Sequence, residues 1–131
     1  MKRKLLCLLT ASLLPALPLT AANIAFVTFH PADGTPDSTA TGASFTNAPD
    51  VGYTKLLAAN GHNVTRFTGA DNLDANPDLI NSLNTNDLII LSRSVSSGYF
   101  QALAEVAAWN TQITKPVMVL NGYLTRGGTG S

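Results

Sequence analysis

The amino-acid sequence predicts a three-layer α/β domain in which a parallel sheet of about four strands lies between helices. Four short runs rich in Val, Ile, Leu and Phe are spaced along the chain. Segments with helical start and stop signals separate them. Strands that alternate with helices pair in parallel through right-handed crossovers and place helices on both faces of the sheet. The expected order of elements is therefore βαβαβαβ.

The first 22 residues predict a signal peptide. A basic start, Met1–Lys4, precedes an apolar run from Leu5 to Leu19, and small residues at 20–22 place the cleavage site before Asn23. An uncleaved membrane anchor is the alternative, but the run is short for a span and contains two prolines. We therefore expect residues 23–131 to be exported to the periplasm or surface of a bacterial cell, as one domain without a membrane span.

The strands and helices of the mature chain follow from local patterns. Strands are expected over Asn23–Phe29, His62–Phe67, Asp87–Leu91 and Pro116–Leu120. Helices are expected over residues 49–60, 77–83 and 97–111, and residues 30–48 form a long loop rich in Gly, Pro, Asp, Ser and Thr. A loop of that length inside a small domain commonly serves as a lid or a binding loop.

The third helix has the clearest pattern. Ser96 or Ser97 is expected to cap it, and its spacing predicts a core-facing stripe of Phe100, Leu103, Val106 and Ala107.

The last strand predicts that the domain is incomplete at its C-terminus. Residues 117–120 are apolar on both faces, as in a strand covered on both sides. Residues 126–131 are Arg, Gly, Gly, Thr, Gly and Ser, so the sequence supplies no further helix or strand to cover it. An uncovered strand edge pairs readily with other chains. We therefore expect residues 23–131, expressed alone, to be marginally stable and prone to associate.

The candidate site lies where the strands end. In a parallel sheet, ligands bind at the carboxyl ends of the strands, where polar loops and helix N-termini meet. The residues there that suit a small polar ligand are His30, Arg93, Ser94, Ser97, Asn121 and Tyr123. No catalytic residue is assigned.

Each candidate also has a structural alternative. His30 suits a general base, but equally a hydrogen bond to the loop that follows it. Arg93 suits a clamp on a carboxylate, a phosphate or sugar hydroxyls, but equally a salt bridge to a loop acid. The serines suit helix caps as well as ligand contacts, and Tyr123 suits a packing wedge as well as a stacking platform for a sugar ring.

The charge distribution and the cysteine content of the mature chain exclude nucleic-acid binding and cysteine-based chemistry. Three of the eight basic residues lie in the leader, so the mature chain has five basic and eight acidic residues and a net charge of −3. The basic residues are scattered singly, which gives nucleic acid no basic patch to bind. The only cysteine, Cys7, also lies in the leader. Asp33, Asp37 and Asp50 are conceivable oxygen ligands beside His30, but turn and helix-start roles account for them, so we expect no metal and no cofactor.

Five segments resemble the class I glutamine amidotransferase-like superfamily, and most closely its uncharacterised exported bacterial members and the ThuA-like (trehalose-utilisation) branch. They are Phe26–His30, Ala48–Thr54, Asn60–Thr65, Leu91–Val95 and Val119–Leu124. The resemblance implies a flavodoxin-like fold, and its ThuA-like part implies a carbohydrate ligand. Active amidotransferases carry a nucleophilic cysteine after the fourth strand, whereas Leu120–Leu124 here contains neither cysteine nor serine. Glutaminase chemistry is therefore not expected.

We accordingly predict an exported domain that binds a small polar ligand, carbohydrate by the resemblance, at the carboxyl ends of the strands. Two alternatives remain open. One is a hydrolase whose remaining catalytic residues lie beyond residue 131. The other is an interaction module of a cell-surface protein, in which the crevice is vestigial.

Overall fold

The structure, a computed structural model, describes residues 20–68 and 72–124. Most of the predicted leader and the glycine-rich end of the chain lie outside these ranges. Four strands form one sheet: β1 (Asn23–Val27), β2 (Asn63–Phe67), β3 (Leu88–Leu91) and β4 (Val117–Val119). All neighbours are parallel and the order is β2-β1-β3-β4. The α/β class, the parallel sheet and the flavodoxin-like arrangement of this small domain are thereby confirmed.

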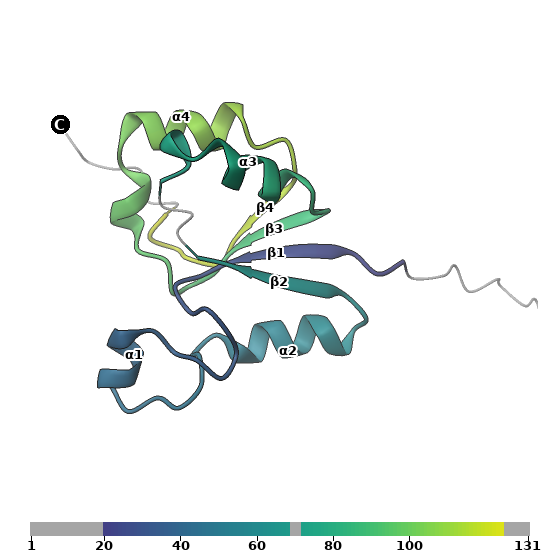
Figure 1. The fold of residues 1–131 in the computed structure, drawn as a ribbon, viewed down its shortest axis with the longest axis vertical. Helices are drawn as coiled ribbons and strands as arrows, with labels where there is room; N and C mark the ends of the chain where they lie inside the picture. The colour runs from purple at the N-terminus through teal and green to yellow at the C-terminus, as the bar shows by residue number, and fades with distance from the viewer. Residues whose placement is uncertain (1–19, 69–71, 125–131) are drawn as a thin grey trace, which may run out of the picture.

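Helices cover both faces of the sheet (Figure 1). On one side lie α1 (Ser38–Gly42) and α2 (Val51–Ala59), and on the other lie α3 (Pro77–Asn84) and α4 (Leu103–Thr111). Two short 3-10 turns, η1 (Leu73–Ala75) and η2 (Ser97–Phe100), precede α3 and α4. None of the described helices is long and apolar enough to cross a membrane.

The core has two parts because alternate residues of β1 and β3 point to opposite faces. Ala25, Val27, Ile89 and Leu91 pack towards α3 and α4. On the other face, Ile24, Phe26 and Ile90 are buried in a smaller cluster that includes Leu57 of α2. The strand order places the carboxyl ends of β1 and β3 side by side at the centre of the sheet, where the candidate loops begin.

The structure corrects two expectations about the helical segments. The predicted helix over 97–111 is interrupted at Gln101 and Ala102 and forms η2 and α4. The long loop contains α1, which begins after Asp37 because the Asp37 carboxylate accepts a hydrogen bond from the Ala40 N–H at 2.8 Å.

The predicted core stripe of the third helix is correct only for Phe100, which packs against the core, and it is wrong for Leu103, Val106 and Ala107. Leu103 is 88% exposed and Val106 is also exposed, whereas Glu105 and Ala108 are the buried residues of α4. Glu105 is tolerated in the interior because its carboxylate accepts hydrogen bonds from Trp109 Nε1 at 2.8 Å and from the Asp74 N–H at 3.2 Å. The face of α4 that carries Glu105 and Ala108, and not the predicted apolar stripe, therefore faces the core.

Strand β4 is exposed along its whole length. Val117, Met118 and Val119 are each at least one-third exposed, and β4 is the last strand of the sheet in the described part of the chain. The apolar side chains of this strand are thus exposed on both of its faces in the described part of the chain.

Candidate functional site

Polar side chains gather at the carboxyl ends of the strands in two separate groups. One group is a buried network beneath the first long loop, and the other lines a pocket between the loops that follow β3 and β4. Four of the six predicted ligand-binding residues belong to the pocket, namely Arg93, Ser97, Asn121 and Tyr123. The remaining two, His30 and Ser94, belong to the buried network.

The buried network begins with a chain of hydroxyl groups that joins β1 to β3. Thr28 Oγ1 donates to Asp50 Oδ2 at 2.6 Å, which uses its only proton. Ser94 must therefore donate in its 2.8 Å contact with Thr28 Oγ1, and Ser92 in its 2.7 Å contact with Ser94. Ser94 Oγ also accepts from the Phe29 N–H at 3.3 Å. The hydroxyl of Ser94 is thus fully used in holding the two loops together.

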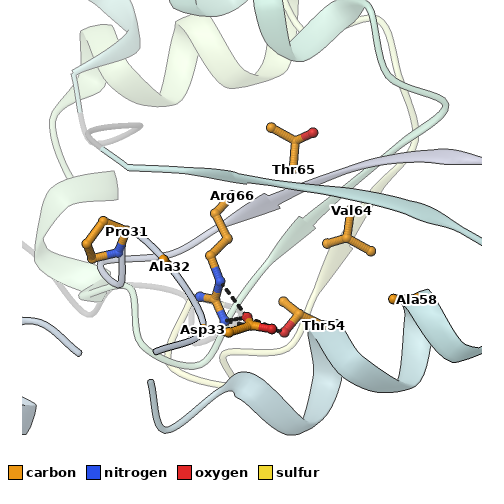
Figure 2. A pocket seen from close by; sticks show the side chains of 8 residues that line it. All are labelled: Pro31, Ala32, Asp33, Thr54, Ala58, Val64, Thr65 and Arg66. Carbon is orange, nitrogen blue, oxygen red and sulfur yellow. Dashed lines mark hydrogen bonds and ion pairs between the residues drawn. The ribbon is translucent and has the colours of Figure 1, made fainter. Parts of the chain in front are cut away.

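Arg66 forms the charged half of the network (Figure 2). It leaves the end of β2 on the α2 side, lies over the Phe26 ring, and its side chain is only 8% exposed. Its Nη1 pairs with Asp50 Oδ1 at 2.9 Å, and its Nη2 pairs with Asp33 Oδ1 at 2.7 Å. The guanidinium therefore ties the long loop and the start of α2 to the sheet.

The two carboxylates differ in their surroundings. Asp50 is only 4% exposed, whereas the side chain of Asp33 is 43% exposed. Partial burial of Asp33 favours its neutral form, but hydrogen bonds from Thr54 and Arg66 and the nearby charges of Arg66 and Lys55 outweigh that effect. The pKa of Asp33 therefore lies below its ordinary value. Asp33 is ionised and paired near neutral pH.

His30 makes the hydrogen bond to the following loop that was the structural alternative to a role as a general base. It is 3% exposed, its Nδ1 accepts from the Asp37 N–H at 3.1 Å, and its carbonyl oxygen accepts from Arg66 Nη1 at 3.3 Å. Since Nδ1 is an acceptor, the ring proton lies on Nε2. His30 therefore holds the start of the long loop, and it is not among the hydrogen-bond partners of Ser94.

The loops at His30 and at 92–97 face each other at the centre of the sheet, because they follow the neighbouring strands β1 and β3. Direct contacts close the space between them, because the Phe29 and Tyr99 rings meet edge-to-face at 5.4 Å and Ser94 bonds to Thr28 and Phe29. The open pocket lies one strand further, towards β4.

This pocket has a volume of about 530 Å³. Arg93, Val95, Ser96, Ser97, Asn121, Gly122 and Tyr123 line it. Asn121 is buried and joins its two walls: its Nδ2 donates to the Val95 carbonyl, and its Oδ1 accepts from the Tyr123 N–H at 3.0 Å. Ser96 caps η2 by accepting from the Gly98 N–H at 3.3 Å, which fixes the other loop. The walls are therefore held in place by the protein itself.

Arg93 stands exposed at this pocket. Within residues 20–68 and 72–124 its guanidinium makes no hydrogen bond and no ion pair, so the alternative of a salt bridge to a loop acid is not observed there. The pocket thus presents a solvated cation beside serine hydroxyls and an exposed tyrosine.

The roles of Arg66, Thr28 and Asp33 in the buried network were not predicted from the sequence. Asp50 was predicted only as a helix start or an oxygen ligand. A signal for Arg66 is present, because in a strand it shares a face with Val64, which packs on the α2 side. An arginine on a core-facing position requires a buried carboxylate as partner. The described residues contain no group of three or more His, Cys, Asp or Glu side chains placed to hold a metal ion.

Comparison with known proteins found no match: no family profile, curated protein or solved structure matches the chain. The fold and the site thus define a small flavodoxin-like α/β domain with a polar pocket at the carboxyl ends of β3 and β4.

Proposed function

We propose that this protein is an exported binding domain that takes a small polar ligand into the pocket between β3 and β4. The observation that carries the proposal is the exposed guanidinium of Arg93, which pairs with no residue in the described ranges, beside a polar hollow of about 530 Å³ at the carboxyl ends of two parallel strands. A cavity of this size accommodates a ligand of roughly monosaccharide to disaccharide dimensions.

The rigidity of the walls favours binding. Asn121 fixes the loop after β4, and Ser96 fixes the turn after β3. Pre-organised walls lower the entropic cost of holding a ligand. Tyr123 is 64% exposed at the rim and offers a flat apolar surface to a ring.

The proposed activity is binding and not hydrolysis. Ser94 donates its hydroxyl proton to Thr28 and contacts no histidine among the described residues. The carboxylate near it, Asp50 at 3.5 Å, is paired with Arg66, so Ser94 has no free base beside it in the described part of the chain to activate it as a nucleophile. The superfamily resemblance makes a carbohydrate the first ligand class to test, without glutaminase chemistry.

The test is a titration of the ¹⁵N-labelled full chain with maltose, glucose, gluconate and glucose 6-phosphate, followed by amide chemical shifts. We expect saturable shifts concentrated at residues 93–97 and 121–123. Ser97→Ala should weaken the binding, whereas Ser38→Ala, which removes an exposed serine hydroxyl from α1, should not. Shifts that spread evenly over the surface, or none at all, would contradict the proposed site.

A further inference from the structure

Among the described side chains that line the pocket between β3 and β4, Arg93 can only donate hydrogen bonds, whereas the hydroxyl and amide groups both donate and accept. Arg93 brings five N–H groups and accepts nothing. Ser97 makes no hydrogen bond through its hydroxyl within the described part of the chain, and Ser96 uses an oxygen lone pair on Gly98, which leaves its proton available. The best side-chain acceptor, Asn121 Oδ1, already accepts from the Tyr123 N–H.

The described lining of the pocket carries a positive charge. Among the described residues that line it, Arg93 is the only charged one. Two carboxylates at the same end of the sheet, Asp50 and Asp33, are both paired with Arg66. No described carboxylate lies within 4.0 Å of the Arg93 guanidinium.

A neutral sugar and an anion make different demands on such a surface. Each sugar hydroxyl donates as well as accepts, so a site for a neutral sugar needs acceptors to receive those protons. A carboxylate or a phosphate only accepts, and it matches a guanidinium with bidentate geometry. The exposed Arg93 guanidinium, with serine hydroxyls beside it that can also donate, therefore favours the anion.

We infer that the ligand carries a carboxylate or phosphate group, which Arg93 and the hydroxyl of Ser97 hold through charge-assisted hydrogen bonds. This inference rests on the proposed function and adds the chemical class of the ligand.

The experiment compares a neutral sugar with two anions derived from it, an open-chain carboxylate and a phosphate ester. Glucose, gluconate and glucose 6-phosphate are titrated into the labelled full chain at low salt, and the dissociation constants are read from the amides of 93–97 and 121–123. We expect at least one of the two anions to bind about tenfold or more tightly than glucose, since hydrogen bonds to charged groups are markedly stronger than neutral ones. Comparing gluconate with glucose 6-phosphate distinguishes carboxylate from phosphate recognition.

Substitutions of Arg93 test whether this residue causes the preference for an anion over glucose. Arg93→Gln should remove the preference for the anion, and Arg93→Lys should retain part of it, because an ammonium keeps the charge but loses the bidentate fork. Lys55→Gln is the matched control, since it removes one exposed cation from α2, on the opposite face of the sheet from α4.

The outcomes separate the two claims. Glucose binding at the pocket as tightly as either anion would overturn the inference and leave the proposed function standing. Equal weakening by Arg93→Gln and Lys55→Gln would overturn the inference, because attraction to net charge would then explain the preference. Absence of pocket shifts with every probe would overturn the proposed function as well.

Discussion

Replacing Arg66 by methionine tests the buried network most severely. The change keeps a long side chain over Phe26 but removes the charge that faces Asp50, whose exposure is only 4%. A buried carboxylate without its partner costs about 3–5 kcal/mol. The pair with Asp33 adds little, because the Asp33 side chain is 43% exposed and water screens it.

The expected loss is a large part of the stability of a small domain, which is about 5–15 kcal/mol in total. At about 4 °C or more per kcal/mol, the melting temperature should fall by roughly 12 °C or more. The assay is urea unfolding followed by tryptophan fluorescence, together with thermal unfolding followed by circular dichroism.

Two further variants test whether the buried ion pair with Asp50 explains this loss of stability. Adding Asp50→Asn to Arg66→Met should recover part of the loss, because the uncompensated charge is then removed. Lys55→Met, which removes an exposed cation near Asp33, should change the free energy of unfolding by less than about 1 kcal/mol. A loss below about 1 kcal/mol for Arg66→Met would show that the ion pair with Asp50 does not hold the loop.

Three other predictions concern separate parts of the molecule. Glu105→Ala should destabilise the domain by about 1–3 kcal/mol in urea unfolding, because Trp109 Nε1 and the Asp74 N–H lose their buried acceptor; a neutral result would mean that water replaces it. The folded-state pKa of Asp33 is lowered, so its stabilising contribution is complete above the unfolded-state pKa and is lost as the pH falls through the folded-state value. Asp33→Asn should therefore reduce the loss of stability on acidification, and an unchanged pH profile would contradict that account. Residues 23–131 should associate with rising concentration in sedimentation velocity, and Met118→Lys on the exposed β4 should reduce this; a monomeric, cooperatively melting parent would refute the expectation.

The sheet was predictable from the sequence because its signals are local. Each strand is a short apolar run, and the alternation of strands with helices leaves parallel pairing as the simple solution. The capping role of Ser96 was also accessible, since serine before a helical turn is a strong signal.

The errors arose where a tertiary contact outweighed a local pattern. The spacing of Leu103 and Val106 predicted a core stripe, but Glu105 is held inside by partners from η1 and from its own helix. Arg66 was counted only among the singly scattered basic residues, because its two carboxylate partners lie 33 and 16 residues earlier in the chain. No local pattern contains that information.

The candidate site was predicted in part for the same reason. Arg93, Ser97, Asn121 and Tyr123 follow strands that are neighbours in the sheet, so knowing the strand order suffices to bring them together. Ser94 and His30 also follow strands, but their side chains are used in hydrogen bonds that depend on Thr28 and Asp37.

A crystal structure of the chain with its tightest-binding acid would show whether the pocket of Arg93 holds an anion. We expect ligand density between Arg93, Ser97 and Tyr123, with an anionic oxygen within hydrogen-bonding distance of the Arg93 guanidinium. Another hollow, of about 440 Å³, lies beside Asp33, Thr54 and Arg66 near the outer edge of β2 (Figure 2). Density there, with the pocket of Arg93 empty, would contradict the account.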